Sequence, residues 1–234
     1  MNEPVQNDCN YLATLAGGLA HEVRNPLNAM ELNLQLMIEE LAAIEDEHGG
    51  RLRRRAALIR DEVRRLDRIL QEFLNYTRGP ELQRAPLAVN DLLERTLEVI
   101  AIQAGQQNVR VMKSFASDLP VVPLDGGVLQ QALLNLCLNA LQAMPQGGDL
   151  IVRTQRQNRS LRIDIIDTGI GIPDESAARV FQAYYSTRKG GSGLGLALAR
   201  RYVEAHNGTI AFASVPGQGT DFTVLLPLPG EGAS

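Results

Sequence analysis

The chain has 234 residues, of which 44% are hydrophobic, and a formal net charge of −4. This length allows one or two domains, each with its own core. The acidic balance argues against a general nucleic-acid surface, and no apolar run approaches the roughly 20 residues that span a bilayer. The polar start of the chain is not a signal peptide. We therefore expect a cytoplasmic protein with no membrane span and no direct nucleic-acid partner.

The first part of the chain predicts two long helices. Apolar residues recur at steps of three and four over residues 12–44, and a second such series covers residues 52–76. The stretch Glu47-His-Gly-Gly50 between them predicts a break. Two such helices would fold back as an antiparallel hairpin, and two hairpins would bury the remaining seam in a four-helix bundle. We predict a tail over residues 1–10, a helical hairpin over 11–78, and a homodimer.

Two other patterns in the chain favour ordinary structural roles. Arginines cluster over residues 51–68, but acidic residues share the segment and favour ion pairs on a solvated helix face over a DNA-binding surface. Cys9 and Cys137 lie far apart in the sequence. Because Cys137 falls in an apolar helical pattern, we expect a buried free thiol and neither a disulfide nor a metal ligand.

Residues 79–86 predict a linker, because Gly79 ends the second helix and two prolines prevent its continuation. Strands and helices then alternate up to residue 229, before a short tail at 230–234. Asn90 is expected to cap the first of these helices. Mixed strands with segregated helices predict a two-layer α/β sandwich over residues 87–229. The expected strands are near 87–90, 109–116, 121–124, 150–156, 161–166, 209–214 and 221–226, and the expected helices span 91–104, the region of Asn135 and Asn139, and 194–206.

Three separated clusters in this second region have the chemistry of a nucleotide site. Asn135 and Asn139 are four apart on an apolar-periodic helix, so they share a face where amide oxygens could hold Mg²⁺. The segment Asp167–Ile172 ends a strand with a carboxylate that could accept the amine of adenine, followed by glycines that let a flat ring approach. The segment Gly190–Leu196 runs into a helix whose first amides would face polyphosphate. Each cluster alone is modest evidence, and a glycine-rich turn before a helix is more often just a turn, but three clusters in one domain favour ATP binding.

Other nucleotide-binding motifs are absent from the sequence. It has no Gly-x-x-x-x-Gly-Lys-Ser/Thr segment, and no glycine triplet has dinucleotide spacing after a strand. The motif set of eukaryotic-type protein kinases is missing too. These absences leave the three clusters as the basis for a nucleotide site.

His21 is the histidine with the most informative position. It lies two residues from each neighbouring apolar seam residue, so its imidazole is expected to face solvent, where it can attack a phosphoryl group. Pro26 is expected to loosen or kink the helix close by. By contrast, His48 is expected in an exposed loop and His206 at a helix C-terminus that favours a cation.

The segment His21-Glu-Val-Arg-Asn-Pro26, taken with the three clusters, resembles the sensor histidine kinases of two-component systems, of the nitrogen-regulation-like type, over about residues 11–228. The resemblance implies a dimerisation and phosphoacceptor hairpin followed by a catalytic domain that binds ATP and Mg²⁺. It implies that His21 is the phosphoacceptor, that Glu22 assists the ring, and that Asn25 supports dephosphorylation of a partner regulator. Asn25 fits equally well as helix punctuation before proline.

The same resemblance assigns the parts of the pocket. It implies that Asn135 and Asn139 bind phosphate and Mg²⁺, with Asn139 as metal ligand, and that Asp167 binds adenine. The segment Val180–Arg188 resembles the family's lid, and it departs from the common pattern at Ala183, Tyr184-Tyr185 and Arg188. Arginine can still clamp phosphate, and Phe181 and the tyrosines are expected to anchor the lid. The remaining ATP-binding residues are expected to be Gly169, Gly171, Thr187, Arg188, Lys189, Gly191, Ser192, Gly193, Leu194 and Gly195.

The function implied is an ATP-dependent histidine autokinase that phosphorylates His21 and passes the phosphoryl group to an aspartate of a response-regulator receiver domain, with regulator dephosphorylation as a second activity. Only about ten residues precede the first helix, which suggests a separate sensor or input protein, or a longer kinase. A non-kinase ATPase of the heat-shock chaperone and MutL type is one alternative, and the histidine box argues against it. A nucleotide-regulated dimeric scaffold is the other, and the intact asparagines and glycines argue against that.

Overall fold

The computed structural model describes the backbone of residues 3–44, 46–187 and 191–228, and within these ranges the side chains from residue 23 onward. The chain divides into two compact units, Met1–Gly79 and Pro80–Ser234. None of the helices in the described part of the chain combines the length and the apolar character that crossing a bilayer requires.

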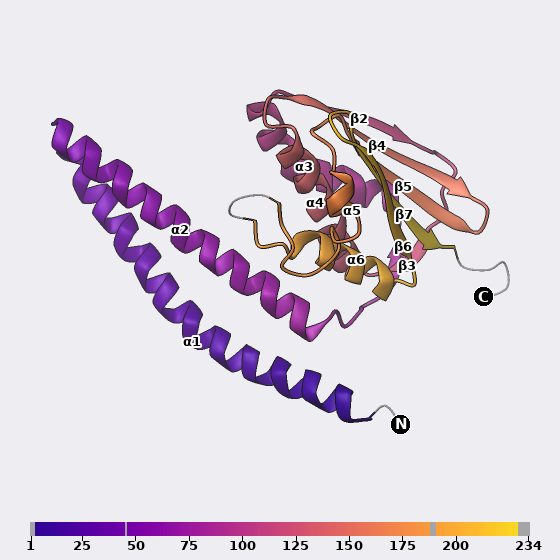
Figure 1. Cartoon of the computed structure of the whole chain (residues 1–234), viewed down its shortest axis with the longest axis horizontal. Coiled ribbons are helices and arrows are strands. Elements are labelled where there is room, and N and C mark those ends of the chain that lie inside the picture. The colour runs from indigo at the N-terminus through magenta and orange to yellow at the C-terminus, as the bar shows by residue number, and fades with distance from the viewer. Residues whose placement is uncertain (1–2, 45, 188–190, 229–234) are drawn as a thin grey trace. The chain divides into compact units, whose positions relative to one another are not determined.

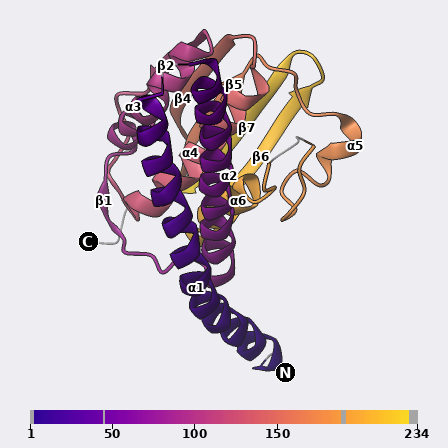
Figure 2. The same ribbon diagram turned by 90° about the vertical axis from the view of Figure 1, so that its left-hand side faces the viewer.

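The first unit is a pair of long helices, α1 (Glu3–Ala42) and α2 (Glu47–Arg78), which run side by side in both views (Figure 1, Figure 2). Leu27 and Leu34 of α1 pack on Ala56 and Val63 of α2 to form the buried core of the pair. Glu31 and Arg64 form an ion pair between the helices, with Oε1 and Nε 2.6 Å apart. The predicted helical hairpin is confirmed.

The predicted break between these helices is wrong in position. Asp46 caps α2 by accepting the Gly49 N–H at 2.6 Å, so the glycine pair lies in the first turn of α2 and His48 is exposed within a helix. A β-carbon at Gly49 would lie 2.6 Å from Ile44, so this glycine permits close packing and does not end a helix. α1 also continues through Pro26 without a break.

The second unit contains a five-stranded sheet in the order β2-β4-β5-β7-β6. β2 and β4 are parallel, and every other neighbouring pair is antiparallel. A separate antiparallel pair joins β1 to β3. The strands are β1 (Ala85–Leu87), β2 (Val109–Phe115), β3 (Val122–Leu124), β4 (Gly148–Gln157), β5 (Ser160–Asp167), β6 (Thr209–Val215) and β7 (Gly219–Pro227).

Helices α3 (Val89–Gln106), α4 (Gly126–Ala143) and α6 (Gly195–Ala205) cover one face of this sheet, and α5 (Asp174–Ala177) is a single turn (Figure 1). Alternation along β5 directs Leu161, Ile163 and Ile165 into the core beneath the helices, where all three are fully buried. Cys137 of α4 is a buried free thiol, as predicted, and burial raises its pKa to about 12. The predicted two-layer α/β sandwich is confirmed.

Two local predictions in this unit are wrong. Asn90 does not cap α3, because the helix begins at Val89 after Ala88. The Asn90 side chain instead joins α3 to the sheet: its Nδ2 donates to the Ala116 carbonyl at 2.8 Å, and its Oδ1 accepts the Thr154 hydroxyl at 2.9 Å. The Asn90 side chain, expected from the local pattern to cap the helix, therefore makes hydrogen bonds to the sheet instead.

His206 is not a cation at the end of α6, because it is only 1% exposed and both ring nitrogens are engaged. Its Nε2 accepts the Asp125 N–H at 3.1 Å, and its Nδ1 lies 2.7 Å from the Tyr202 carbonyl oxygen. A nitrogen that accepts an N–H carries no proton of its own. The ring is therefore neutral, with its proton on Nδ1 and donated to Tyr202.

Candidate functional site

Asp167 is the last residue of β5 and lies on the sheet face that the helices cover, since it continues the alternation of Ile163 and Ile165. It is 2% exposed, and its Oδ1 accepts the Gly169 N–H at 2.9 Å. This contact fixes the carboxylate against the loop that follows the strand. A carboxylate held in this way is a strong acceptor for an N–H group such as the exocyclic amine of adenine.

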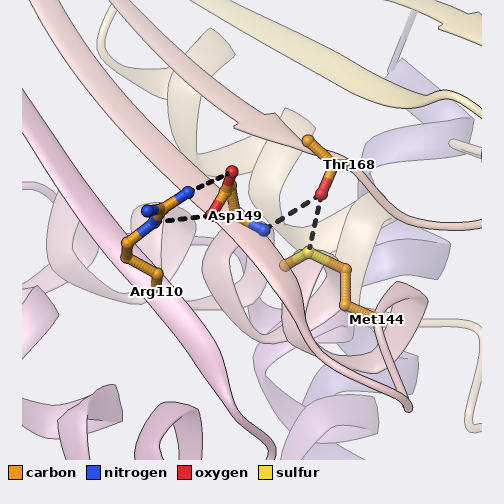
Figure 3. A network of polar contacts seen from close by, with 4 residues as sticks. All are labelled: Arg110, Met144, Asp149 and Thr168. Carbon is orange, nitrogen blue, oxygen red and sulfur yellow. Dashed lines mark hydrogen bonds and ion pairs between the residues drawn. The ribbon is translucent and has the colours of Figure 1, made fainter.

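Thr168, the residue after Asp167, is anchored by its side chain (Figure 3). Its hydroxyl oxygen accepts the Asp149 N–H at 3.0 Å, and the hydroxyl points to Met144 Sδ at 3.9 Å. Asp149 is held in turn by two hydrogen bonds of 2.9 Å from Arg110, and this hydrogen bonding lowers the pKa of Asp149. The end of β5 is thereby tied to the start of β4 and to the end of α4.

The glycine loop, Asp167–Ile172, fits closely between α4 and β6. A β-carbon at Gly169 would lie 2.5 Å from the Ala143 carbonyl oxygen. Gly171 has a φ of +70°, and a β-carbon there would lie 2.4 Å from the Val215 carbonyl oxygen. The Ile170 N–H also donates to the Ala143 carbonyl at 3.1 Å. Gly169 is therefore required because a side chain has no space there. Gly171 is required both for space and for its positive φ.

Asn135 and Asn139 are both half-buried on α4 and, four residues apart, share one side of the helix. Asn139 lies four residues before Ala143, so it is one helical turn from the carbonyl that holds the glycine loop. The structure thus brings the asparagine cluster and the Asp167 cluster together. Amide oxygens in this position suit a hard cation such as Mg²⁺ bound beside phosphate oxygens.

The third cluster lies at the start of α6. Gly193 has a φ of +70° and packs against the lid backbone, where a β-carbon would lie 2.6 Å from the Tyr184 carbonyl carbon. Ser192 Oγ accepts the Leu194 N–H at 3.2 Å, and Leu194 is fully buried. Gly195 begins α6, faces open space, and is preceded by an N-cap residue with no side-chain cap among the described residues. Amides at such a helix start can bind an anion.

The lid is anchored by the aromatic residues expected to hold it. Phe181 packs edge-on against Phe212 and Phe222, with ring centroids 5.9 and 6.2 Å apart. The Tyr185 hydroxyl donates to the buried Ser176 at 2.8 Å, so tyrosine at this position gains a contact that phenylalanine would lack. Tyr184 differs, because it is mostly exposed.

The other lid residues assigned to ATP have different standing. Thr187, within the lid, is exposed, and Gly191, after the lid, is exposed too. Arg188 and Lys189 lie outside the described residues. The lid cations expected from the sequence therefore stay a prediction.

The histidine box lies on α1, in the other unit. His21 and Glu22 are within the helix, and their side chains lie outside the described residues. Asn25 is exposed and, four residues after His21, shares its side of the helix.

Sequence reasoning missed Thr168 and the junction of Asp125 with His206. The hydroxyl of Thr168 gave no signal of its own beside the Asp-x-Gly pattern. Asp125 directly before Gly126 and Val128 of α4 could have been found as a helix N-cap, which is a common role for aspartate.

Two families of known proteins match this chain, one in each of its two units. Residues 11–82 match the family described as "His Kinase A (phospho-acceptor) domain", and residues 125–230 match "Histidine kinase-, DNA gyrase B-, and HSP90-like ATPase". The chain is 33% identical over 217 residues to "Sensor histidine kinase ZraS" of Escherichia coli, covering 93% of this chain and 46% of that protein. It is 34% identical over 227 residues to "Sensory histidine kinase/phosphatase NtrB" of Shigella flexneri, covering 92% and 62%.

Among solved structures, full-length ShkA in complex with AMPPNP is similar, with a TM-score of 0.76 and 26% identity. The similarity covers 94% of this chain and 47% of ShkA. The chain thus spans about half the length of several relatives that it matches. Both of its units have their counterparts in these proteins. The chain therefore belongs to the sensor histidine kinases of two-component systems, and it carries a phospho-acceptor domain and an ATPase domain.

Proposed function

We propose that the chain is an ATP-dependent autokinase that phosphorylates His21 and then passes the phosphoryl group to an aspartate of a response-regulator receiver domain. The observation that carries the proposal is the buried carboxylate of Asp167, which accepts the Gly169 N–H, in a chain whose first helix bears the histidine box. The pocket supplies a nucleotide site, and the box supplies an acceptor.

The residues of the pocket fit ATP and Mg²⁺. Asp167 would accept the adenine amine, and the glycine loop that follows it is held closely between α4 and β6. The first amides of α6, together with Gly191 and Gly193, would face the phosphates. Asn139, with Asn135 beside it, would supply an amide oxygen to Mg²⁺. The cation, when bound, neutralises charge on the phosphates.

The transfer step needs a nucleophile and little other covalent chemistry from the protein. A ring nitrogen of His21 forms a bond to the γ-phosphorus as the bond from phosphorus to the β,γ-bridging oxygen breaks. ADP leaves with that electron pair, and the other ring nitrogen, which carries the proton of the neutral imidazole, gives that proton up. Glu22, the next residue, would assist by accepting that proton or by orienting the ring. The pocket contributes positioning and electrostatic stabilisation.

A homodimer is the state that we propose for this chain. Leu27 and Leu34, seven residues apart on α1, pack against α2. A second series spaced by seven residues is exposed: Val23, Met30, Met37 and Ile44. Met30 is 51% and Met37 50% exposed. On α2, Ile59 and Leu66 repeat the pattern beside the buried Ala56 and Val63. A second hairpin would cover both exposed stripes in a four-helix bundle.

The proposed acceptor of the phosphoryl group is a receiver aspartate. Its carboxylate oxygen attacks the phosphorus while the bond from phosphorus to the ring nitrogen breaks, and the nitrogen keeps that electron pair. The relative NtrB is named a kinase and phosphatase. We extend this to Asn25, whose exposed amide could orient a water toward a phosphoaspartate docked near His21.

Incubation with Mg-ATP labelled in the γ-phosphate tests the proposal and separates it from its alternatives. The autokinase is expected to retain label that resists alkali and is lost in acid, and His21→Gln is expected to lose that label while still binding ATP. Release of inorganic phosphate without labelled protein would favour a non-kinase ATPase. Nucleotide binding with neither outcome would favour the scaffold.

A further inference from the structure

The last residues of the predicted linker are bound to the catalytic unit. The Gln83 N–H donates to Asp125 Oδ2 at 2.7 Å, and the Arg84 Nη2 donates to the Ala205 carbonyl at 3.1 Å. Directly afterwards, β1 pairs with β3, with Ala85 opposite Leu124. The free part of the linker is therefore shorter than the sequence suggests, and only residues 79–82 lie between the end of α2 and Gln83.

Asp125 makes two different contacts with its two carboxylate oxygens. Oδ1 accepts the Val128 N–H at 3.0 Å and so caps α4, whereas Oδ2 accepts the linker amide of Gln83. The Val128 contact is the largest cause of a lowered pKa at Asp125, and the Gln83 contact lowers the pKa further, against the opposing effect of burial. A cap alone needs only one of these oxygens.

The backbone of Asp125 is fixed as well. Its N–H donates to Nε2 of the buried His206, which follows directly after α6. Ala205, the last residue of α6, receives Arg84. We call the set of Gln83, Arg84, Asp125, Ala205 and His206 the linker clasp. It joins the linker to the start of α4 and to the end of α6.

These are the two helices whose other parts carry the proposed ATP site. Asn139 lies near the end of α4, and the glycine segment around Gly193 precedes α6. The clasp therefore attaches the linker to the same rigid elements that hold the nucleotide. Before the clasp, Gly79 ends α2 with a φ of +71°, a conformation that favours glycine and turns the chain out of the helix.

We propose that Asp125 is a positioning residue for phosphoryl transfer: by holding Gln83 to α4, it fixes the short connection through which the nucleotide-bearing helices are delivered to His21. The inference rests on the proposed autokinase function. It predicts that breaking the Asp125–Gln83 bond slows transfer at saturating ATP and leaves ATP affinity unchanged. A role as helix cap alone would give a different result, because loss of the cap would disturb α4 and its nucleotide ligands.

Asp125→Asn separates the two roles of the carboxylate. Asparagine is an equally good N-cap, so one amide oxygen can still accept the Val128 N–H. Its amide nitrogen would then face the Gln83 N–H, and two donors cannot bond. Gln83→Pro removes the same bond from the other side, because proline has no N–H, and leaves Asp125 intact. The matched control is Asp46→Asn, which changes the cap of α2, where the described side-chain bond goes to Gly49 alone.

The experiment combines single-turnover autophosphorylation at saturating Mg-ATP, nucleotide calorimetry and amide hydrogen exchange on the full chain. We expect both variants to transfer about tenfold more slowly, with an ATP Kd within about twofold of wild type. Exchange should rise over residues 82–85. The double variant Asp125→Asn with Gln83→Pro should be no slower than either single variant, since both remove one bond. Asp46→Asn should exchange like wild type over residues 82–85.

Two results would overturn the proposal. One is a wild-type transfer rate in Asp125→Asn despite faster exchange at residues 82–85. The other is a large loss of ATP affinity in both variants, which would show that the substitutions disturb α4 and its nucleotide ligands and not the linker alone. If the wild-type chain takes up no phosphoryl group, the proposed function fails separately, and unchanged exchange in Asp125→Asn would still refute the clasp.

Discussion

Replacing Asp167 by asparagine is expected to weaken ATP binding with little change in the pocket's shape. The substitution keeps an oxygen that can accept the Gly169 N–H, now 2.9 Å from Oδ1. It replaces the second carboxylate oxygen by an NH₂ group and removes the negative charge. A purine amine that approaches this side chain would then meet a weaker acceptor or another donor.

The size of the effect follows from burial. Asp167 is 2% exposed, so water cannot replace a lost contact to the ligand. Hydrogen bonds to charged groups contribute about 1.5–3 kcal/mol. This range corresponds to an increase in the ATP Kd of roughly 10- to 150-fold.

Titration calorimetry with ATP and Mg²⁺ measures this change, and Asp164→Asn is the matched control. Asp164 is also a buried carboxylate on β5, 5% exposed, but it lies on the other face of the sheet, bonded to Arg162 and Thr223. Its substitution should leave the Kd within about twofold of wild type, although it removes buried polar contacts. Equal affinities for Asp167→Asn and wild type would refute the assignment of Asp167 to adenine.

Three further predictions concern the regulator, the dimer and the buried thiol. Asn25→Ala should keep autophosphorylation at His21 and slow the loss of phosphoryl from the regulator by about tenfold or more; an unchanged decay rate would leave Asn25 a structural role only. Met37→Glu should yield monomers by light scattering, because it places charge in the exposed heptad stripe, whereas Leu32→Glu, at a more exposed residue outside that stripe, should remain dimeric. Burial raises the pKa of the Cys137 thiol to about 12, so between the pKa of the unfolded thiol and this value unfolding releases a proton. In that range the free energy of unfolding should fall with rising pH by about 1.4 kcal/mol per pH unit more steeply than in Cys137→Ala. Parallel pH profiles in urea unfolding would contradict that linkage.

The parts of the fold that the sequence predicted well depend on repeated local patterns. The apolar periodicity around Cys137 predicted a buried helix, and α4 occupies that position. Alternation at Leu161, Ile163 and Ile165 predicted β5, because one face of the strand had to be buried. Each pattern repeats one physical requirement several times, so a single unusual residue does not obscure it.

Single residues whose partners are distant in sequence were predicted less well. His206 was expected to be a cation from its place at a helix end, but its partner Asp125 is 81 residues away and requires a neutral ring. Asn90 likewise bonds to Thr154 across 64 residues. Gly49 was expected to break a helix, and its proximity to Ile44 explains why a glycine occurs inside α2.

In the candidate site, too, local motifs were predicted from the sequence and contacts between distant residues were not. The order of Asn139, Asp167 and the glycine segments predicted a nucleotide site, because each residue type has a distinct role in binding ATP. The anchoring of Thr168 by Asp149 and Met144 could not be predicted, since it depends on how β4, β5 and α4 meet. The linker clasp was missed for the same reason.

Mapping the phosphorylated residue by tandem mass spectrometry is the most direct test of the central claim. The full chain would be incubated with Mg-ATP, digested under alkaline conditions and compared with an Asn139→Ala chain treated identically. We predict one phosphoryl group on the imidazole of His21 in the wild-type chain, and little or none in Asn139→Ala because the metal and phosphate ligands are incomplete. A phosphoryl group on any other side chain, or equal modification of His21 in Asn139→Ala, would contradict it.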